Sequence, residues 1–289
     1  MALRTDAIRY AVTALAVIAA VFVGWRLWDF YTLSPWTRDA RVLANVVGIA
    51  PDVAGLISAI NVVDNQTVRK GDVLFVIDRQ RFEVAVEQAT AVVEMKRQAL
   101  TLAKDTAARD ASLQSDAGGV ISVEAAEKSA VAAAEAAAEL QEAEAELATA
   151  NINLTRTEVR SPANGYVTNL TASVGDYATT GHGVMAVVDS DSFYVYAYFM
   201  ETKLPAIRDG AAAEVRLMAG GAVIEGTVEG VSRAIADPNT RGGSLLADVD
   251  PEFDWIRLAQ RIPVRIRLGA VPAGVRLISG LSCTVVVAP

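Results

Sequence analysis

The chain contains very few of the side chains that most often carry chemistry. Cys283 is its only cysteine and His182 its only histidine among 289 residues. An intramolecular disulfide is therefore impossible, and we expect no zinc site built from cysteine and histidine ligands. A single cysteine is compatible with oxidising and reducing compartments alike. We predict that the protein binds no metal and no cofactor.

The sequence also lacks the short motifs of the common enzyme classes. It contains no G-x-S-x-G, no G-x-x-x-x-G-K-[ST], and no G-x-G-x-x-G opening a helix. His182 lies in "TTGHGVM", which is typical of an exposed turn. The net charge of −8 and the pI near 4.8 argue against nucleic-acid binding and against a polybasic attachment to lipid. We predict a protein that is not an enzyme and binds no nucleic acid.

Only one long apolar run occurs, "YAVTALAVIAAVFVGW" from Tyr10 to Trp25. Taken from Tyr10 to Trp28, with Arg26 snorkelling to the interface, the segment is just long enough to span a bilayer. We predict a single-pass anchor with residues 1–9 in the cytoplasm and the remainder translocated. The alternative is a cleaved signal peptide, because Ala14-Leu15-Ala16 resembles a cleavage box. That box lies inside the apolar run, which favours the anchor.

Two long segments, 79–114 and 122–161, contain no glycine and no proline. The second alternates spacings of three and four in a heptad pattern: Ala133, Ala136, Leu140, Ala143, Leu147, Ala150 and Leu154. The first has a less regular series, interrupted at Lys96: Phe82, Val86, Ala89, Val93, Leu100, Ala103 and Ala107. We predict an antiparallel coiled-coil hairpin over 79–157, about 50 Å long at 1.5 Å per residue, with its tip at 114–122.

Two stretches on either side of the hairpin look like copies of one pattern. They are "APDVAGLISAINVVDNQTVRKGDVLFVID" (50–78) and "SPANGYVTNLTASVGDYATTGHGVMAVVD" (161–189). Each predicts about four short strands, which would be marginally stable alone. We therefore expect the two copies to face each other as opposite walls of one sandwich. The matching structural residues are Pro51 with Pro162, Gly55 with Gly165, Gly71 with Gly181, and Asp78 with Asp189.

After residue 190 the chain shows short strand-like runs separated by glycine and proline, which is typical of small β-barrels. In "PVRIRL", apolar residues alternate with Arg265 and Arg267, so one face is buried and the other solvated. These arginines are either a solvated strand face or a surface for a partner. The segment 236–255 has the composition of a loop.

Taken together, these features resemble the membrane fusion proteins (HlyD-like), the periplasmic adaptors of tripartite efflux pumps. The resemblance is strongest to the adaptor subunit of aromatic carboxylic acid (p-hydroxybenzoate) efflux pumps, which share "SPWTRDARV" (34–42) and "ETKL" (201–204). Related multidrug adaptors have an acidic residue and a tyrosine where this chain has Arg38 and Arg41. The other stretches that carry the resemblance are "APDVAGLI" (50–57), "VRKGDVLFVID" (68–78), "RSPANGYVTNL" (160–170) and "WIRLAQRIPVRIRL" (255–268).

The resemblance implies a mainly β fold with a long α-helical coiled-coil hairpin. The expected parts are a transmembrane helix (10–28), a membrane-proximal linker or strand (29–45), a split lipoyl/biotinyl-like barrel sandwich (46–78 and 158–190), and a β-barrel with a membrane-proximal β domain (191–289). It also implies a location in the bacterial inner membrane, with most of the chain in the periplasm.

The function implied is a link between an inner-membrane transporter and a TolC-like outer-membrane channel, exporting aromatic carboxylic acids or drugs. The adaptor would associate with itself as a hexamer. The resemblance also implies that Arg109, Leu113 and Ser122 contact the channel at the hairpin tip. The simpler interpretation makes them a surface arginine, a seam leucine and a helix cap.

Other interpretations remain open. One is an adaptor for peptide or protein secretion, and another is an anchored coiled-coil protein unrelated to export. A lipoate or biotin carrier is disfavoured because Lys70 is not at the junction between the two copies, where the carrier lysine belongs. The glutamates of the second helical segment are interpreted as a solvated face, with cation binding as the alternative.

Overall fold

The computed structural model describes residues 13–26, 34–115, 121–235 and 259–288. The chain divides into two compact units. One comprises Val46–Ser190, and the other combines Met1–Asn45 with Asp191–Pro289. Each unit is described by itself.

The first unit contains a sandwich of two four-stranded sheets. One sheet has the order β2-β9-β7-β4 and the other the order β6-β5-β3-β8. Within each sheet the neighbouring strands run antiparallel. The strands are β2 (Val46–Ile49), β3 (Gly55–Ile60), β4 (Thr67–Val68), β5 (Val73–Ile77), β6 (Glu158–Arg160), β7 (Gly165–Thr168), β8 (Tyr177–Ala178) and β9 (Met185–Asp189).

The expectation that each sequence copy forms one wall is wrong. Each sheet takes two strands from each predicted half, 46–78 and 158–190. For example, β4 of the first half pairs with β7 of the second, and β8 of the second pairs with β3 of the first. The physical reason is that a two-residue strand cannot stabilise a separate sheet, whereas the exchange pairs it with a longer strand. The exchange also ties the copies together across the long insertion.

The repeat is nevertheless visible in the turns. Asn65 and Gly175 both have positive φ, 64° and 97°, as do Gly71 and Gly181, 94° and 77°. Gln66 follows Asn65, and Asp176 follows Gly175; both side chains close the same kind of turn. Gln66 Oε1 accepts a hydrogen bond from the Val63 amide at 2.9 Å, and Asp176 Oδ2 accepts one from the Ser173 amide at 2.7 Å. The local chemistry therefore repeats even though the sheets are mixed.

Gly55 and Gly165 occupy equivalent positions, as the first residues of β3 and β7. A Cβ on Gly165 would lie 1.9 Å from the Val188 carbonyl oxygen, and one on Gly55 would lie 2.6 Å from Ile77 Cγ2. The backbone of β9 therefore leaves no room for a side chain at Gly165, whereas at Gly55 the obstacle is the side chain of Ile77. The sandwich core beside them is apolar: Ile49, Val53, Ile57, Val62, Val68, Leu74, Phe75, Ile77, Val167, Ala178, Met185 and Val187.

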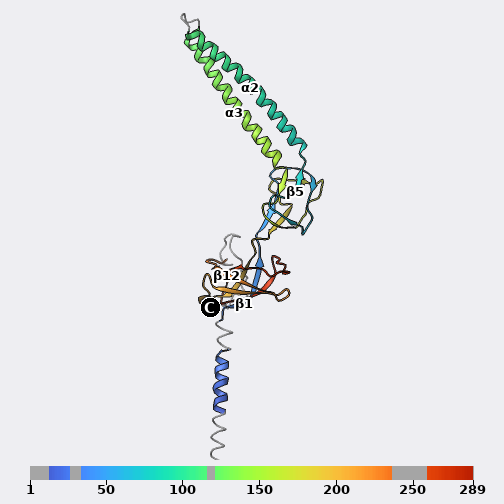
Figure 1. The fold of residues 1–289 in the computed structure, drawn as a ribbon, viewed down its shortest axis with the longest axis vertical. Helices are drawn as coiled ribbons and strands as arrows, with labels where there is room; N and C mark the ends of the chain where they lie inside the picture. The colour runs from blue at the N-terminus through green and yellow to red at the C-terminus, as the bar shows by residue number, and fades with distance from the viewer. Residues whose placement is uncertain (1–12, 27–33, 116–120, 236–258, 289) are drawn as a thin grey trace, which may run out of the picture. The chain divides into compact units, whose positions relative to one another are not determined.

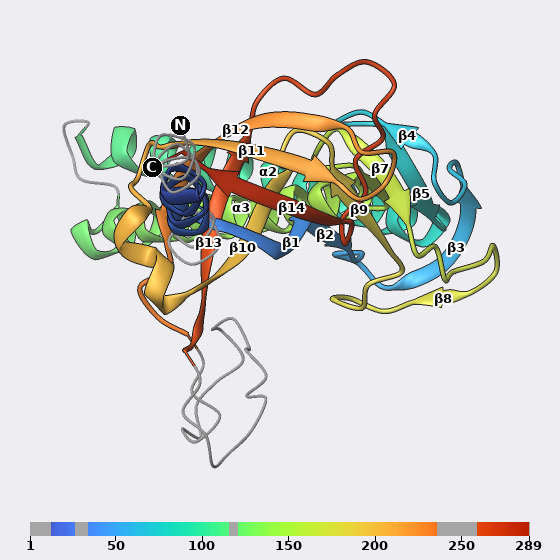
Figure 2. The same ribbon diagram turned by 90° about the horizontal axis from the view of Figure 1, so that it is seen from below.

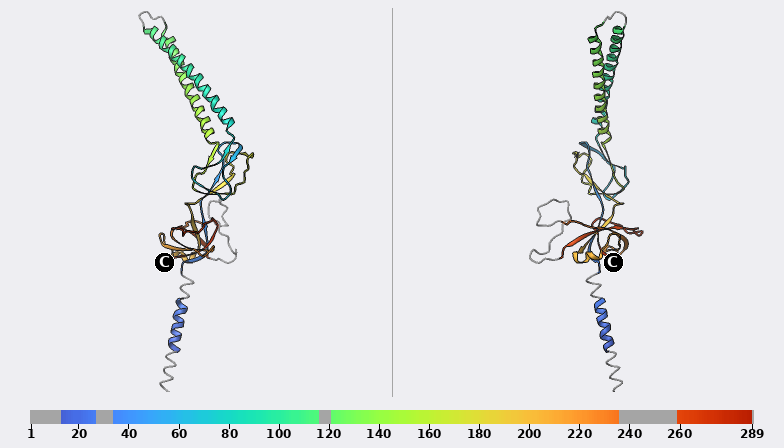
Figure 3. Two further views of the ribbon diagram at one scale, coloured as in Figure 1. Left: turned by 45° about the vertical axis from the view of Figure 1, so that its right-hand side comes forward. Right: turned by 90° about the vertical axis from the view of Figure 1, so that its left-hand side faces the viewer.

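Between the two copies the chain forms two long helices, α2 (Gln80–Ser115) and α3 (Val123–Thr155). They lie side by side along their length (Figure 1 and Figure 3). All the predicted seam residues are buried or half-buried, with Val93 and Ala143 the most buried. This burial supports the predicted coiled coil. Lys96, the interruption in the α2 series, is half-buried, and its Nζ lies 2.9 Å from Glu139 Oε2 on α3.

The second unit is a closed six-stranded barrel with the order β1-β10-β13-β12-β11-β14 (Figure 2). Its strands are β1 (Trp36–Leu43), β10 (Tyr194–Met200), β11 (Ala212–Leu217), β12 (Val223–Val231), β13 (Arg261–Leu268) and β14 (Ser282–Val287). A short 3-10 helix, η1 (Glu201–Ala206), follows β10. The predicted β-barrel is confirmed.

One detail of the barrel differs from the prediction. The strand expected in the membrane-proximal linker is β1, which pairs with both β10 and β14 and closes the barrel. Ala40 and Val42 point into the core, and this burial holds β1 in place. The described residues of this unit therefore form one barrel, without a separate membrane-proximal β domain.

The predicted anchor, Tyr10 to Trp28, is described only in part. Residues 13–26 are helical and all exposed, whereas 10–12, 27–28 and the predicted cytoplasmic end lie outside the described residues. No helix in the described part of the chain has both the length and the apolar character needed to cross a bilayer. The anchor stays a prediction.

Candidate functional site

The hairpin end brings the three predicted channel-contact residues to one end of the helix pair. Arg109 is exposed and forms no ion pair with a described residue, whereas Leu113 is half-buried near the end of α2. Ser122 caps α3, and its Oγ accepts a hydrogen bond from the Ala125 amide at 3.2 Å. Residues 116–120, which include the glycine pair, lie outside the description. Ser122 has the role of a helix cap whether or not it also contacts a channel.

Each helix of the hairpin carries a second apolar stripe that the hairpin does not use. On α2, Met95 and Leu102 are 59% and 67% exposed and lie one heptad apart. On α3, spacings of three and four join exposed residues in a second series: Val131, Ala134, Ala138, Gln141, Ala145, Ala148 and Ile152. The sequence analysis considered only one seam per helix. The same heptad count, shifted in phase, would have found the second.

The two helices also differ in charge. α3 carries seven glutamates and one lysine, a net charge of −6, whereas α2 has five acidic and five basic residues and is neutral. A shallow hollow of about 300 Å³ lies along the apolar stripe of α2. It is lined by Ala99, Leu102, Ala103, Thr106, Ser129 and Ala132. Each helix thus carries a small exposed apolar surface, and the helix around it is neutral for α2 and acidic for α3.

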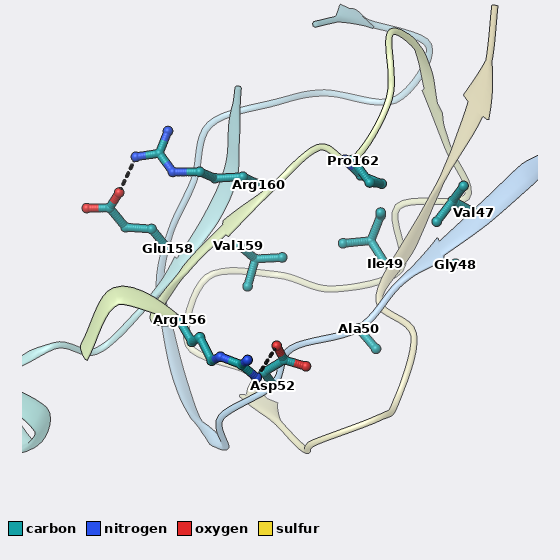
Figure 4. Close-up of a pocket in the computed structure, with 10 residues that line it drawn as sticks. All are labelled: Val47, Gly48, Ile49, Ala50, Asp52, Arg156, Glu158, Val159, Arg160 and Pro162. Atoms are coloured by element: carbon teal, nitrogen blue, oxygen red, sulfur yellow. Dashed lines mark hydrogen bonds and ion pairs between the residues drawn. The ribbon is translucent and has the colours of Figure 1, made fainter. Parts of the chain in front are cut away.

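A cavity of about 260 Å³ lies in the sandwich, where β2 and β6 are the end strands of the two sheets (Figure 4). Two ion pairs border it. Arg156 Nη1 lies 2.7 Å from Asp52 Oδ2, and Arg160 Nη2 lies 2.5 Å from Glu158 Oε2. Arg156 therefore pairs with Asp52, whereas Arg160 shares the Glu158 carboxylate with Arg79. The cavity can hold an apolar group against Val47, Ile49 and Val159, but it contains no activated nucleophile.

The residues with the most reactive side chains are scattered. His182 is exposed in the turn before β9, and Lys70 is exposed beside Gly71 in the turn before β5. Cys283 is buried in the barrel core, where burial raises the pKa of its thiol to about 11. Within the described residues, no group of three histidine, cysteine or acidic side chains is placed to hold a metal.

The outer face of the barrel gathers aromatic rings and arginines. Tyr196 of β10 lies in register between Arg41 of β1 and Arg265 of β13. The Arg265 guanidinium stacks 3.9 Å from the Tyr194 ring centroid, and its Nε lies 2.8 Å from Glu229 Oε2. Burial raises the pKa of the nearby Tyr198 hydroxyl, and the Asp39 carboxylate raises it further. Tyrosine and arginine on one exposed sheet face are typical of protein interaction surfaces.

Two protein-family models match the chain. The barrel-sandwich hybrid domain of RND membrane fusion proteins (RND MFP) matches residues 45–190, and an AAEA-like beta-barrel domain matches residues 192–288. The first model alone covers half of the chain. The chain belongs to the membrane fusion protein family of periplasmic adaptors.

Comparison with curated and solved proteins agrees with this assignment. This membrane fusion protein is 41% identical over 281 residues to the uncharacterized protein YdhJ of Escherichia coli (strain K12), covering 97% of this chain and 98% of YdhJ. The membrane fusion protein Spr0693 of Streptococcus pneumoniae R6 is 16% identical, with a TM-score of 0.64 over 88% of this chain and 99% of that chain. ZneB of Cupriavidus metallidurans is 26% identical, with a TM-score of 0.50 over 89% of this chain and 100% of that chain.

Proposed function

We propose that this membrane fusion protein is the adaptor subunit of a tripartite efflux pump, linking an inner-membrane transporter to a TolC-like outer-membrane channel. The carrying observation is a long helical hairpin inserted into a barrel sandwich, in a chain that continues into a β-barrel. The mechanism is assembly of a conduit, and energy comes from the transporter. The exported compound is selected by the transporter.

Self-association follows from the hairpin. A helix with a second heptad seam can pack against a second neighbour as well as against its own partner. The exposed stripes on α2 and α3 would let the neutral helix of one copy pack against the acidic helix of the next. Closure of this head-to-tail contact gives a ring. The resemblance to the family favours six copies.

The hairpin tip is proposed to dock on the channel through Arg109, Leu113 and Ser122. In support, Arg109 is exposed and forms no ion pair with a described residue, and all three residues lie at one end of the helix pair. The apolar segment from Tyr10 to Trp28 is proposed as the inner-membrane anchor.

Aromatic carboxylic acids are the proposed cargo. The support is the resemblance of the stretches "SPWTRDARV" and "ETKL" to the adaptors of aromatic carboxylic acid efflux pumps. A peptide or protein secretion adaptor remains the second candidate class. No observation on the described residues favours it.

The tip provides the test. Leu113→Asp should abolish the tolerance of cells to aromatic acids and drugs, because a charge at the docking surface opposes association. The amount of membrane-bound protein should not change. Tolerance is measured as the growth-inhibitory concentration of each compound, and protein by immunoblot of the membrane fraction.

The matched control is Thr101→Asp, which adds the same charge at an exposed position of α2 beside Arg97 and Lys104, outside both stripes. It should leave tolerance unchanged. Full tolerance in the Leu113→Asp strain would contradict the efflux proposal.

A further inference from the structure

Trp36, the first residue of β1, is surrounded by positive charge. Lys203 of η1 places its Nζ 4.8 Å from the centroid of the indole ring and donates a hydrogen bond to the Trp36 carbonyl at 3.1 Å. The Arg38 guanidinium carbon lies 5.6 Å from the same centroid. Two cations therefore share one aromatic ring.

No carboxylate balances these cations within the described residues. Neither Arg38 nor Lys203 forms an ion pair there. Asp39, next in the chain, is paired with Arg261 at 2.5 Å, and Glu201 of η1 makes no ion pair with Lys203. This local excess contrasts with Arg265 of the barrel face, which is paired with Glu229.

The cluster is also short of hydrogen-bond acceptors. The indole Nε1 of Trp36 is buried and finds no acceptor among the described residues. Buried donors without an acceptor are rare in folded proteins, and each such group indicates a missing partner or a functional site. Burial lowers the pKa of the Lys203 ammonium, consistent with a cation that has lost water without gaining a counter-charge. An oxyanion would supply both the charge and the acceptors.

We propose that Trp36, Arg38 and Lys203 form a binding site for a phosphate group, carried by an anionic lipid headgroup or present as the free ion. Guanidinium groups match the geometry of phosphate oxygens, and an ammonium adds a point charge. Tryptophan with lysine or arginine is also the usual composition at a membrane–water interface.

The position in the chain supports the lipid source, which rests on the proposed anchor. β1 begins ten residues after the apolar helix at 13–26, a reach of at most about 35 Å. A site so tethered lies within range of the headgroups. The overall charge of −8 argues against broad attachment to anionic lipid, so the attraction has to be local.

The full chain is tested with Trp36 as its only tryptophan, after replacing Trp25, Trp28 and Trp255 by phenylalanine. The protein is reconstituted in nanodiscs that contain a headgroup spin-labelled lipid, with either phosphatidylglycerol or phosphatidylcholine as the bulk lipid. Quenching of Trp36 fluorescence should be strong with phosphatidylglycerol, weaker with phosphatidylcholine, and reduced by salt. Inorganic phosphate added to the protein in detergent tests the free ion.

Arg38→Gln and Lys203→Gln keep a flexible polar side chain and remove the charge. Each should weaken the response by about fivefold, the worth of one cation at an anionic surface. The control is Arg216→Gln, which removes a barrel arginine that already has a partner in Glu214. It should change nothing.

A response to inorganic phosphate without lipid-dependent quenching assigns the site to the free ion. The proposal is overturned if Arg38→Gln and Lys203→Gln leave the quenching unchanged. It is also overturned if neither the anionic lipid nor inorganic phosphate produces a response. Folding of each variant is checked by circular dichroism. Absent quenching together with lost tolerance in the Leu113→Asp strain overturns the phosphate site alone. Normal quenching together with full tolerance in the Leu113→Asp strain contradicts the adaptor function and leaves the site.

Discussion

The two units of this chain differ in charge and in how they are stabilised. Residues 46–190 carry 20 acidic and 11 basic residues, a net charge of −9, whereas the described barrel segments carry 10 basic and 7 acidic residues, a net of +3. The barrel closes on 16 buried residues, while each hairpin helix has a single buried side chain. The barrel therefore encloses its apolar core, whereas the hairpin leaves large apolar side chains exposed.

The largest expected effect is in the barrel core. Phe199 is fully buried, so Phe199→Ala should lower the free energy of unfolding of the barrel by about 3–5 kcal/mol. Chemical denaturation, followed by the tyrosine signal of β10, measures this change. If the barrel depended on other chains, the loss would vary with protein concentration, contrary to this expectation.

The next effect concerns the sandwich of the other unit. Gly165→Ala should cost about 1–3 kcal/mol, because the new Cβ would strike the Val188 carbonyl oxygen, which cannot rotate away. Gly55→Ala at the equivalent position meets only Ile77 Cγ2, a side-chain atom, and should cost less. Thermal unfolding of the two variants compares them. Equal losses would show that the two copies are packed alike.

A third prediction uses the Cys283 thiol in the barrel. Its folded pKa of about 11 exceeds the ordinary value of 9.0, so the folded state holds the proton longer. The protonated thiol therefore contributes its full share to the free energy of unfolding below pH 9. As the pH rises from 9 to 11, that free energy falls by up to about 2 kcal/mol. The free energy of unfolding of the barrel, measured over this pH range, should fall less steeply in Cys283→Ala than in the unmodified protein. An identical slope in both proteins would rule out the thiol as the cause.

The smallest effect separates the two stripes of the hairpin. Val93→Ala should lower hairpin stability by about 1.5 kcal/mol, because two buried methyl groups are lost. Ile152→Ala removes a side chain that is 53% exposed and should barely change the stability of the single chain. Sedimentation should instead show weaker self-association for Ile152→Ala. Unchanged association would argue against packing of neighbouring hairpins through α3.

Much of the fold was predictable, because the signals are local. The heptads of α2 and α3 and the absence of glycine or proline inside them define two helices. The equivalent glycines mark the copies of the sandwich, since Gly71 and Gly181 adopt a conformation that other residues rarely reach. The exchange of β4 and β8 between copies was missed, because two-residue strands have no periodicity to detect.

Of the two candidate sites, one was predicted from the sequence and the other was visible only in the structure. Arg109, Leu113 and Ser122 were predicted from the resemblance to the adaptor family, and the structure places them at one end of the hairpin. The cluster of Trp36, Arg38 and Lys203 joins residues far apart in the chain. That no described carboxylate pairs with its cations depends on where Asp39 and Glu201 lie. No spacing rule predicts such a cluster.

The sequence by itself determined the elements of this protein: an apolar N-terminal segment, a repeated half-domain, two heptad helices and a strand-rich C-terminal part. Each depends on the conformational preferences and periodicity of neighbouring residues. Only the tertiary structure decided that the copies share their sheets, that β1 closes a barrel with β10 and β14, and that two cations meet at Trp36. These depend on which distant segments bury apolar area together, and that free energy is set by the whole fold.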